Sequence, residues 1–165
     1  MHWGLFYLPT SLPEKPGQGA DAYRTILEQV RYAEGLGFES VWLAEHHFQA
    51  FGGMFASPAV LGAAIAQHTR RMRIGTAVIL LPYHNPIRTA EDYATLDLLS
   101  NGRLEFGVGH GFLKWEGLNF GLALEESRER FREHLDIVLK AWTQPSVSHK
   151  GRFYEYNNLA VWPRP

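Results

Sequence analysis

The sequence predicts an α/β protein built on a parallel sheet. Short apolar runs rich in aromatic and β-branched residues alternate four times with longer segments of helical periodicity. The clearest run covers residues 75–82, where five consecutive apolar side chains lie between Gly75 and Pro82. An unbroken run of this kind is typical of a strand buried on both faces, which favours a parallel sheet.

Composition supports one domain, or part of one, and excludes several classes of function. With 165 residues, 45% of them hydrophobic, the chain can bury a single core. The 16 basic and 17 acidic residues form no basic stripe, which argues against a nucleic-acid partner. The absence of cysteine excludes disulfides, thiolate metal sites and cysteine nucleophiles. No segment approaches the ~20 apolar residues that cross a bilayer, so we expect a cytoplasmic protein with no membrane partner.

The first half of the chain predicts two strands around one helix. The first strand covers residues 3–8 and ends at a loop rich in proline and glycine. Asp21 can cap the helix that follows, and Gly37 supplies its left-handed stop. The second strand covers residues 40–44 and leads directly into the polar cluster 45–48.

The second half continues the alternation. Ser57 followed by Pro58 predicts the start of a helix that runs to about residue 68, ahead of the strand at 75–82. Asn85 can cap a third helix over residues 86–99.

A fourth strand is predicted over residues 103–108, followed by a glycine-rich turn at 109–111. The longest helix is predicted over residues 125–142. Its apolar stripe consists of Phe131, Leu135, Val138, Leu139 and Trp142.

Two parallel architectures fit this pattern, an open doubly wound sheet and a (β/α)8 barrel. A barrel places its working residues at the carboxyl ends of several strands, whereas an open sheet concentrates them at one crevice. Polar or glycine-rich clusters follow the second, third and fourth predicted strands in the same way. The sequence therefore favours the (β/α)8 TIM barrel, of which four βα units make half.

The cluster Glu45-His46-His47 is the first candidate site. An imidazole at a strand end has a pKa near working pH, which suits proton transfer or polarisation of a substrate. The alternative is that one histidine hydrogen-bonds within the loop and the other packs outward. Glu45, His46, His47 and His110 could also be metal ligands, but adjacent histidines in extended chain point in opposite directions, so we expect no metal site.

The glycine-rich stretch 107–111 is the second candidate. It lacks the G-x-G-x-x-G spacing of a nucleotide fingerprint, and no helix is predicted directly behind it. Its three glycines would let a flat or bulky ligand approach the backbone, with His110 as a possible donor. The alternative is ordinary turn chemistry.

Three segments together resemble the bacterial luciferase-like flavin monooxygenase family. They are WLAEHHF at 42–48, the stretch 75–88, and NGRLEFGVG at 101–109, and the resemblance spans the whole chain. It implies that residues 1–165 are the N-terminal part of a single luciferase-like (β/α)8 barrel domain. It also implies an enzyme that uses reduced FMN, delivered by a separate flavin reductase, and molecular oxygen to oxidise an aldehyde or another small organic substrate.

The resemblance also assigns residues. His46 matches the family's active-site histidine, and Glu45 matches its acidic neighbour. Thr76, Ala77 and Val78 match the strand that meets the flavin ring, where the family typically has a non-prolyl cis peptide, here expected between Ala77 and Val78.

Gly109 and His110 match positions near the flavin where bacterial luciferase itself has a cysteine and an arginine. Both departures weaken any claim of light emission.

Two alternative functions remain open. A related branch of the family transfers hydride with the deazaflavin F420, and a non-catalytic barrel relative is the other possibility. The stretch 153–163 resembles the family's segment between its fourth helix and fifth strand. We therefore expect a fragment of a longer protein, or a half that pairs with another chain, for example as a homodimer, and weak FMN binding by the chain alone.

Overall fold

The structure is a computed structural model that describes residues 1–8, 18–48 and 54–165. The predicted loop ahead of the first helix and part of the loop after His47 lie outside the described residues. The chain divides into two compact units. Unit 1 comprises residues 1–79 and 99–107, and unit 2 comprises residues 80–98 and 108–165.

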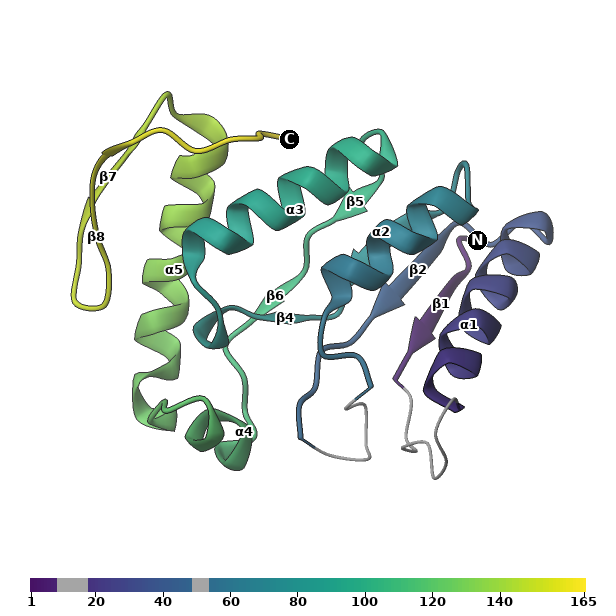
Figure 1. Ribbon diagram of the computed structural model, residues 1–165, viewed down its shortest axis with the longest axis horizontal. Coiled ribbons are helices and arrows are strands. Elements are labelled where there is room, and N and C mark those ends of the chain that lie inside the picture. The colour runs from purple at the N-terminus through teal and green to yellow at the C-terminus, as the bar shows by residue number, and fades with distance from the viewer. Residues whose placement is uncertain (9–17, 49–53) are drawn as a thin grey trace. The chain divides into compact units, whose positions relative to one another are not determined.

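Unit 1 contains a four-stranded parallel sheet (Figure 1). Its strands are β1 (Gly4–Tyr7), β2 (Ser40–Leu43), β3 (Arg73–Thr76) and β5 (Leu104–Glu105), in the order β1-β2-β3-β5. Every neighbouring pair is parallel, which confirms the predicted fold class. Each new strand joins the edge left by the one before it, so the sheet winds in a single direction.

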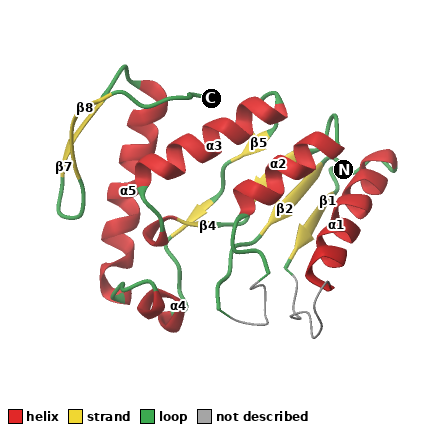
Figure 2. Ribbon diagram, viewed as in Figure 1, coloured by secondary structure: helices red, strands yellow, loops and turns green. Residues whose placement is uncertain are grey.

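One face of this sheet forms the core of unit 1. This face carries Val41, Leu43 and Ile74, which are completely buried. Helices α1 (Gln18–Gly35) and α2 (Pro58–His68) also contribute completely buried apolar side chains. Figure 2 shows helices alternating with the strands of this sheet. Right-handed crossovers, the rule for such connections, place consecutive helices on the same face of a parallel sheet. The opposite face carries the register row Phe6, Trp42, Gly75 and Glu105.

Helix α1 ends as predicted but starts earlier. Gly37 has a φ of +92°, and the N–H groups of Phe38 and Gly37 donate to the carbonyls of Ala33 and Glu34. This pair of bonds is a Schellman motif. The prediction that Asp21 caps the helix is wrong, because the helix begins at Gln18 and the Asp21 carboxylate instead accepts a hydrogen bond from Arg24 (2.9 Å).

The strands predicted over 75–82 and 103–108 are each divided. The chain leaves β3 at Thr76 and re-enters a strand as β4 (Ile79–Leu80), while β5 is followed by β6 (Val108–Gly109). Strands β4 and β6 form a separate two-stranded sheet. The prediction of two continuous strands is wrong because the Thr76 side chain hydrogen-bonds to the Gly107 backbone where the β3–β5 ladder would continue. The expected burial of the apolar run is correct for Ile79 and Leu80.

The described chain of unit 2 contains helices and a hairpin. The helical segments are η1 (Leu81–Tyr83), α3 (Pro86–Ser100), α4 (Lys114–Asn119), η2 (Leu124–Glu126) and α5 (Ser127–Thr143). The antiparallel hairpin consists of β7 (Val147–Lys150) and β8 (Glu155–Leu159). Helix α4 and the hairpin are absent from the sequence prediction. In the parts of the chain that the structure describes, no helix is long and apolar enough to cross a membrane.

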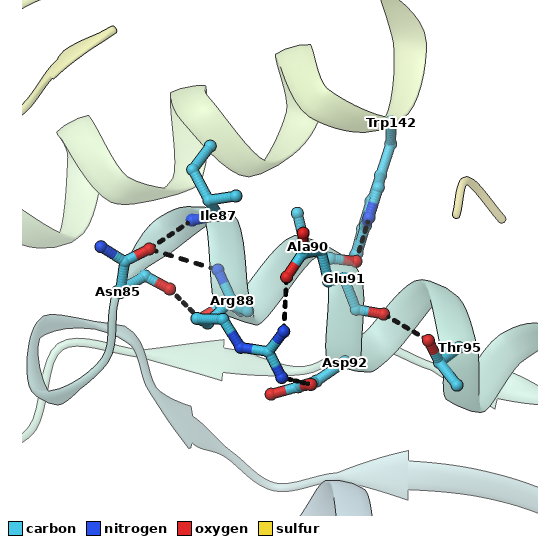
Figure 3. Close-up of polar contacts among 9 residues, drawn as sticks. Asn85, Ile87, Arg88, Ala90, Glu91, Asp92, Thr95 and Trp142 are labelled. Carbon is cyan, nitrogen blue, oxygen red and sulfur yellow. Dashed lines mark hydrogen bonds and ion pairs between the residues drawn. The ribbon is translucent and has the colours of Figure 1, made fainter. Parts of the chain in front are cut away.

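Helix α3 begins as predicted. The Asn85 side-chain oxygen accepts the backbone N–H groups of Ile87 (3.0 Å) and Arg88 (3.2 Å), which makes it the N-cap (Figure 3). The Trp142 indole donates to the carbonyl of Ala90 (2.9 Å) and joins α5 to α3. Helix α2 also starts at its predicted proline, although the Ser57 side chain makes no capping bond.

The buried face of α5 differs from the predicted stripe. Leu139 is 48% exposed, and of the predicted set only Val138 is fully buried. The residues that are buried are Ser127, His134, Ile137, Val138 and Ala141. At 17 residues, α5 is also shorter than the 18-residue α1.

Candidate functional site

The carboxyl ends of β2 and β3 carry the candidate residues of unit 1. Beyond Leu43, the Ala44 N–H donates to the Tyr7 carbonyl (3.3 Å), so the chain continues in line with the sheet toward Glu45. Glu45 is 2% exposed, and His46 is half-buried. Both therefore lie at the sheet edge where parallel α/β proteins place their sites.

Glu45 and His47 form a buried pair. The Glu45 carboxylate lies 2.8 Å from His47 Nε2, and His47 is only 8% exposed. In an extended chain, residues two positions apart lie on the same side, and the Glu45–His47 contact agrees with that arrangement. The expectation that one histidine hydrogen-bonds within the loop is confirmed for His47, and Glu45 is the residue that holds it.

The Ala77–Val78 segment connects β3 to β4 at the same sheet edge. The peptide bond between these two residues is cis, as the sequence resemblance predicts. The Ala77 N–H donates to the Leu43 carbonyl at the end of β2 (2.7 Å), which ties this segment to the strand that leads to His46. Both side chains are half-buried.

Gly107, which lies between β5 and β6, supports this segment. The Thr76 hydroxyl donates to the Gly107 carbonyl (2.7 Å) and accepts its N–H (3.0 Å), and the Ile79 N–H donates to the same carbonyl (2.9 Å). A Cβ at Gly107 would lie 2.0 Å from the Thr76 carbonyl oxygen. Gly107 is therefore needed for close backbone approach within the sheet, a role that an isolated glycine in a strand pattern can indicate.

Gly109 and His110 belong to unit 2. Gly109 is the last residue of β6, and His110 Nδ1 lies 3.3 Å from the hydroxyl of Ser127, which itself donates to the His110 carbonyl. Gly111 has a φ of +75°, and a Cβ there would lie 2.6 Å from the Tyr83 hydroxyl. The His110 ring is thus positioned by the first residue of α5.

The structure therefore gathers the candidate residues into two sets. In unit 1, one edge of the sheet carries Glu45, His46, Thr76, Ala77 and Val78, while Gly109 and His110 lie in unit 2. Among the described residues, no three His, Asp or Glu side chains are gathered as metal ligands would be. Leu43, which accepts the Ala77 N–H, was not predicted as a site residue. Gly107 was predicted to make room for a ligand, whereas its missing side chain makes room for the Thr76 carbonyl.

These features define a parallel α/β protein with polar groups and an irregular segment at the carboxyl ends of its strands. A model of the luciferase-like monooxygenase family matches residues 1–165. The chain belongs to this family.

Individual relatives agree with the assignment. The chain is 36% identical over 163 residues to the alkanal monooxygenase alpha chain of Photorhabdus luminescens, which covers 99% of this chain and 44% of the relative. It is 34% identical over 148 residues to an F420-dependent glucose-6-phosphate dehydrogenase of Amycolatopsis mediterranei, covering 86% of this chain and 44% of the relative. The chain thus spans less than half the length of these curated relatives.

A solved structure shows the same fold. The crystal structure of monooxygenase RslO1 from Streptomyces bottropensis matches with a TM-score of 0.94 and 33% identity, over 99% of this chain and 50% of that one. Family members therefore include proteins named as monooxygenases and proteins named as F420-dependent dehydrogenases.

Proposed function

We propose that this chain forms the N-terminal part of a flavin-dependent monooxygenase that uses reduced FMN and molecular oxygen to oxidise a small organic substrate such as an aldehyde. The observation that carries the proposal is the Ala77–Val78 segment, which is bonded to the end of β2 and lies at the same sheet edge as His46. Family membership and the monooxygenase relatives support it. A separate flavin reductase would supply the reduced cofactor.

The sheet topology supports a barrel. In β1-β2-β3-β5 every crossover adds a strand at the same edge, and the order does not reverse as it does in an open doubly wound sheet. We propose that these are the first four βα units of a (β/α)8 barrel, with the site at the carboxyl ends of the strands.

The proposed cofactor residues come from both units. In unit 1, Ala77 and Val78 have small, half-buried side chains that leave room for a flat ring. In unit 2, Gly109 is the last residue of β6 and His110, a possible donor, follows it. When bound, reduced FMN would supply the oxygen chemistry. We assign Thr76, Ala77, Val78, Gly109 and His110 to the cofactor.

His46 is the proposed catalytic residue. A half-buried imidazole at the strand end can hold or move a proton at one ring nitrogen, as a base or as a hydrogen-bond donor. We propose that Glu45 contributes to catalysis through the chain segment: by holding His47 on one side, it keeps His46 on the other.

The test uses the natural full-length protein. We expect it to bind reduced FMN under anaerobic conditions and, once oxygen is admitted, to oxidise an added alkanal. His46→Ala should retain FMN binding while product formation falls about 100-fold or more, the usual effect of losing a proton-transfer group. His68→Ala, at the exposed end of α2, is the matched control and should leave both unchanged. Undiminished product formation by His46→Ala would end the catalytic assignment.

The second candidate is F420-dependent hydride transfer, favoured by the relative named as an F420-dependent dehydrogenase. Parallel titrations with FMN and F420 separate the two. Saturable binding of F420 alone would favour hydride transfer, and binding of neither would favour a non-catalytic relative of the family.

A further inference from the structure

We infer that Thr76 is a positioning residue, whose hydroxyl holds the Ala77–Val78 segment in place for the flavin and does not itself contact the cofactor. This inference rests on the proposed function, because it states how the chain prepares that cofactor site. Thr76 was assigned above to the cofactor, and the inference specifies that its role there is to hold the Ala77–Val78 segment rather than to touch the flavin.

The Thr76 hydroxyl is fully used within the sheet. Thr76 is 1% exposed, and its hydroxyl donates to the Gly107 carbonyl (2.7 Å) and accepts the Gly107 N–H (3.0 Å). A hydroxyl has a single hydrogen to donate. Because that hydrogen is directed at Gly107 and the side chain is buried, the hydroxyl has none left to give a ligand.

The same glycine bonds to the other side of the segment. The Ile79 N–H donates to the Gly107 carbonyl (2.9 Å), so the residues that flank Ala77–Val78 are attached to one point on the neighbouring chain. The Ala77 N–H adds a third attachment at Leu43 (2.7 Å). Thr76 is the residue that contributes a side chain to this arrangement, whereas the Ile79 and Ala77 bonds join backbone groups.

The contact also depends on Gly107 having no side chain. A Cβ at this position would lie 2.0 Å from the Thr76 carbonyl oxygen, a backbone atom that cannot move aside independently. The close approach lets one hydroxyl reach both the N–H and the C=O of the same residue. Thr76 and Gly107 therefore act as one pair, although 31 positions separate them in the sequence.

Loss of the hydroxyl should loosen the segment without removing the sheet. The Gly107 N–H retains its bond to the Glu105 carbonyl (3.1 Å), and the β2–β3 ladder does not involve the Thr76 side chain. A binding segment that must be ordered by the ligand binds more weakly than one already held in place. Flavin affinity should therefore fall further than a general loss of stability explains.

A matched control lies in the same unit. The Thr69 hydroxyl is also buried; it donates to the Ile65 carbonyl (2.8 Å) and accepts a hydrogen bond from Arg103 (2.9 Å). Thr69 follows the end of α2 and precedes β3, so it is at the opposite end of the sheet from Ala77. Thr69→Val and Thr76→Val each remove one buried hydroxyl with two hydrogen bonds at nearly constant shape.

The experiment compares Thr76→Val, Thr76→Ser and Thr69→Val in the natural full-length protein. For each we would measure the Kd for the flavin that the wild type binds, the absorption spectrum of the bound flavin, and the urea midpoint. Thr76→Val should weaken flavin binding roughly tenfold, equal to about 1.4 kcal/mol, and change the spectrum. Thr76→Ser should restore both the affinity and the spectrum. Thr69→Val should lower the urea midpoint as much as Thr76→Val does, while its flavin Kd and spectrum stay those of the wild type.

Two outcomes overturn the inference. In one, Thr76→Val binds flavin as the wild type does; in the other, Thr69→Val weakens binding as much as Thr76→Val, which would make the effect one of stability alone. If Thr76→Val does not fold, a structure of the wild type with bound flavin decides: a Thr76 hydroxyl bonded to the flavin overturns the inference, and one still bonded to Gly107 supports it. A wild type that binds neither FMN nor F420 rejects the proposed function, and the inference with it.

Discussion

His134 is a completely buried histidine on the inner face of α5. The Thr89 hydroxyl gives its hydrogen to the Asn85 carbonyl (3.1 Å), so His134 Nε2, 3.1 Å from that hydroxyl, must carry the hydrogen in their contact. Nδ1 then holds a lone pair, and within the described chain it has no hydrogen-bond partner. Burial lowers the pKa of His134 to about 3, and the nearby His84 acts in the same direction.

This histidine should make stability depend on pH. Its pKa of about 3 when folded lies below the ordinary value of 6.5, so the unfolded chain binds the proton more readily. The contribution of neutral His134 to the free energy of unfolding is complete above about pH 6.5. It is lost as the pH falls toward the folded-state pKa, and about 2 kcal/mol of it is gone at pH 5. Urea midpoints at pH 7.5 and pH 5 should differ less for His134→Phe, which cannot titrate, than for the wild type. An unchanged difference would show that another group carries the dependence.

Arg103 shows why a motif's role could not be deduced from sequence. Asn101 and Gly102 have φ values of +58° and +74°, and they lead to a guanidinium that donates to the carbonyls of Ala66, Thr69 and Met72. The motif NGR at 101–103 therefore holds the end of α2 and the chain that follows it in place. Its partners lie 31 to 37 positions away, a relation that local periodicity does not contain.

At the scale of elements, Glu133 joins the β7–β8 hairpin to α5. Its carboxylate accepts the backbone N–H groups of Arg152 (3.1 Å), Phe153 (3.1 Å) and Tyr154 (2.8 Å), and lies 3.0 Å from His149 Nε2. Burial alone would raise the pKa of Glu133. The hydrogen bonds from His149, Tyr154 and Phe153 outweigh it and hold the pKa below the ordinary value of 4.5.

Glu133→Gln should release the turn of this hairpin. The amide keeps one acceptor oxygen for a set of donors that two charged oxygens serve in the wild type, so we expect a loss of about 1–3 kcal/mol at pH 7. Hydrogen exchange of the amides at 152–154 should accelerate. Because the folded pKa is lowered, the wild type keeps this contribution above pH 4.5 and loses it as the pH falls further.

The control for this prediction is Glu129→Gln. The Glu129 carboxylate pairs with Arg152 (2.5 Å) on the surface, where an ion pair contributes less than about 1 kcal/mol. Equal destabilisation by the two variants would contradict the assigned role of Glu133.

The elements themselves were largely predictable, and their interruptions were not. Apolar runs and capping residues located the parallel strands and the starts of α2 and α3, because those signals are local. The divisions at Thr76 and Gly107 arise from a contact between the end of β3 and the chain between β5 and β6. At the candidate site, side-chain alternation predicted that the adjacent histidines diverge. The contact between Glu45 and His47 could not be predicted, because it depends on how the loop folds.

At the scale of the whole molecule, the described residues of unit 1 leave aromatic side chains exposed at one face of its sheet. Phe6 is 58% exposed and Trp3 is 59% exposed, and with Trp42 they line a hollow of about 420 Å³. Strands of parallel sheets are normally covered on both faces. Exposed apolar patches mark interaction surfaces or ligand grooves, and on a parallel sheet we expect another protein segment as the partner.

We expect the 165-residue chain, expressed alone, to associate through this face and to bind FMN weakly. Sedimentation velocity over a range of concentrations should show association, and Phe6→Lys should reduce it because a charge among these exposed aromatic side chains opposes burial there. Tyr32→Lys is the control, since Tyr32 is a comparably exposed aromatic residue (71%) on helix α1 rather than on the sheet. If Tyr32→Lys reduces association as much as Phe6→Lys, the contact does not run through the sheet. A wild-type chain that is monomeric at every concentration would mean that this parallel sheet tolerates water on one face.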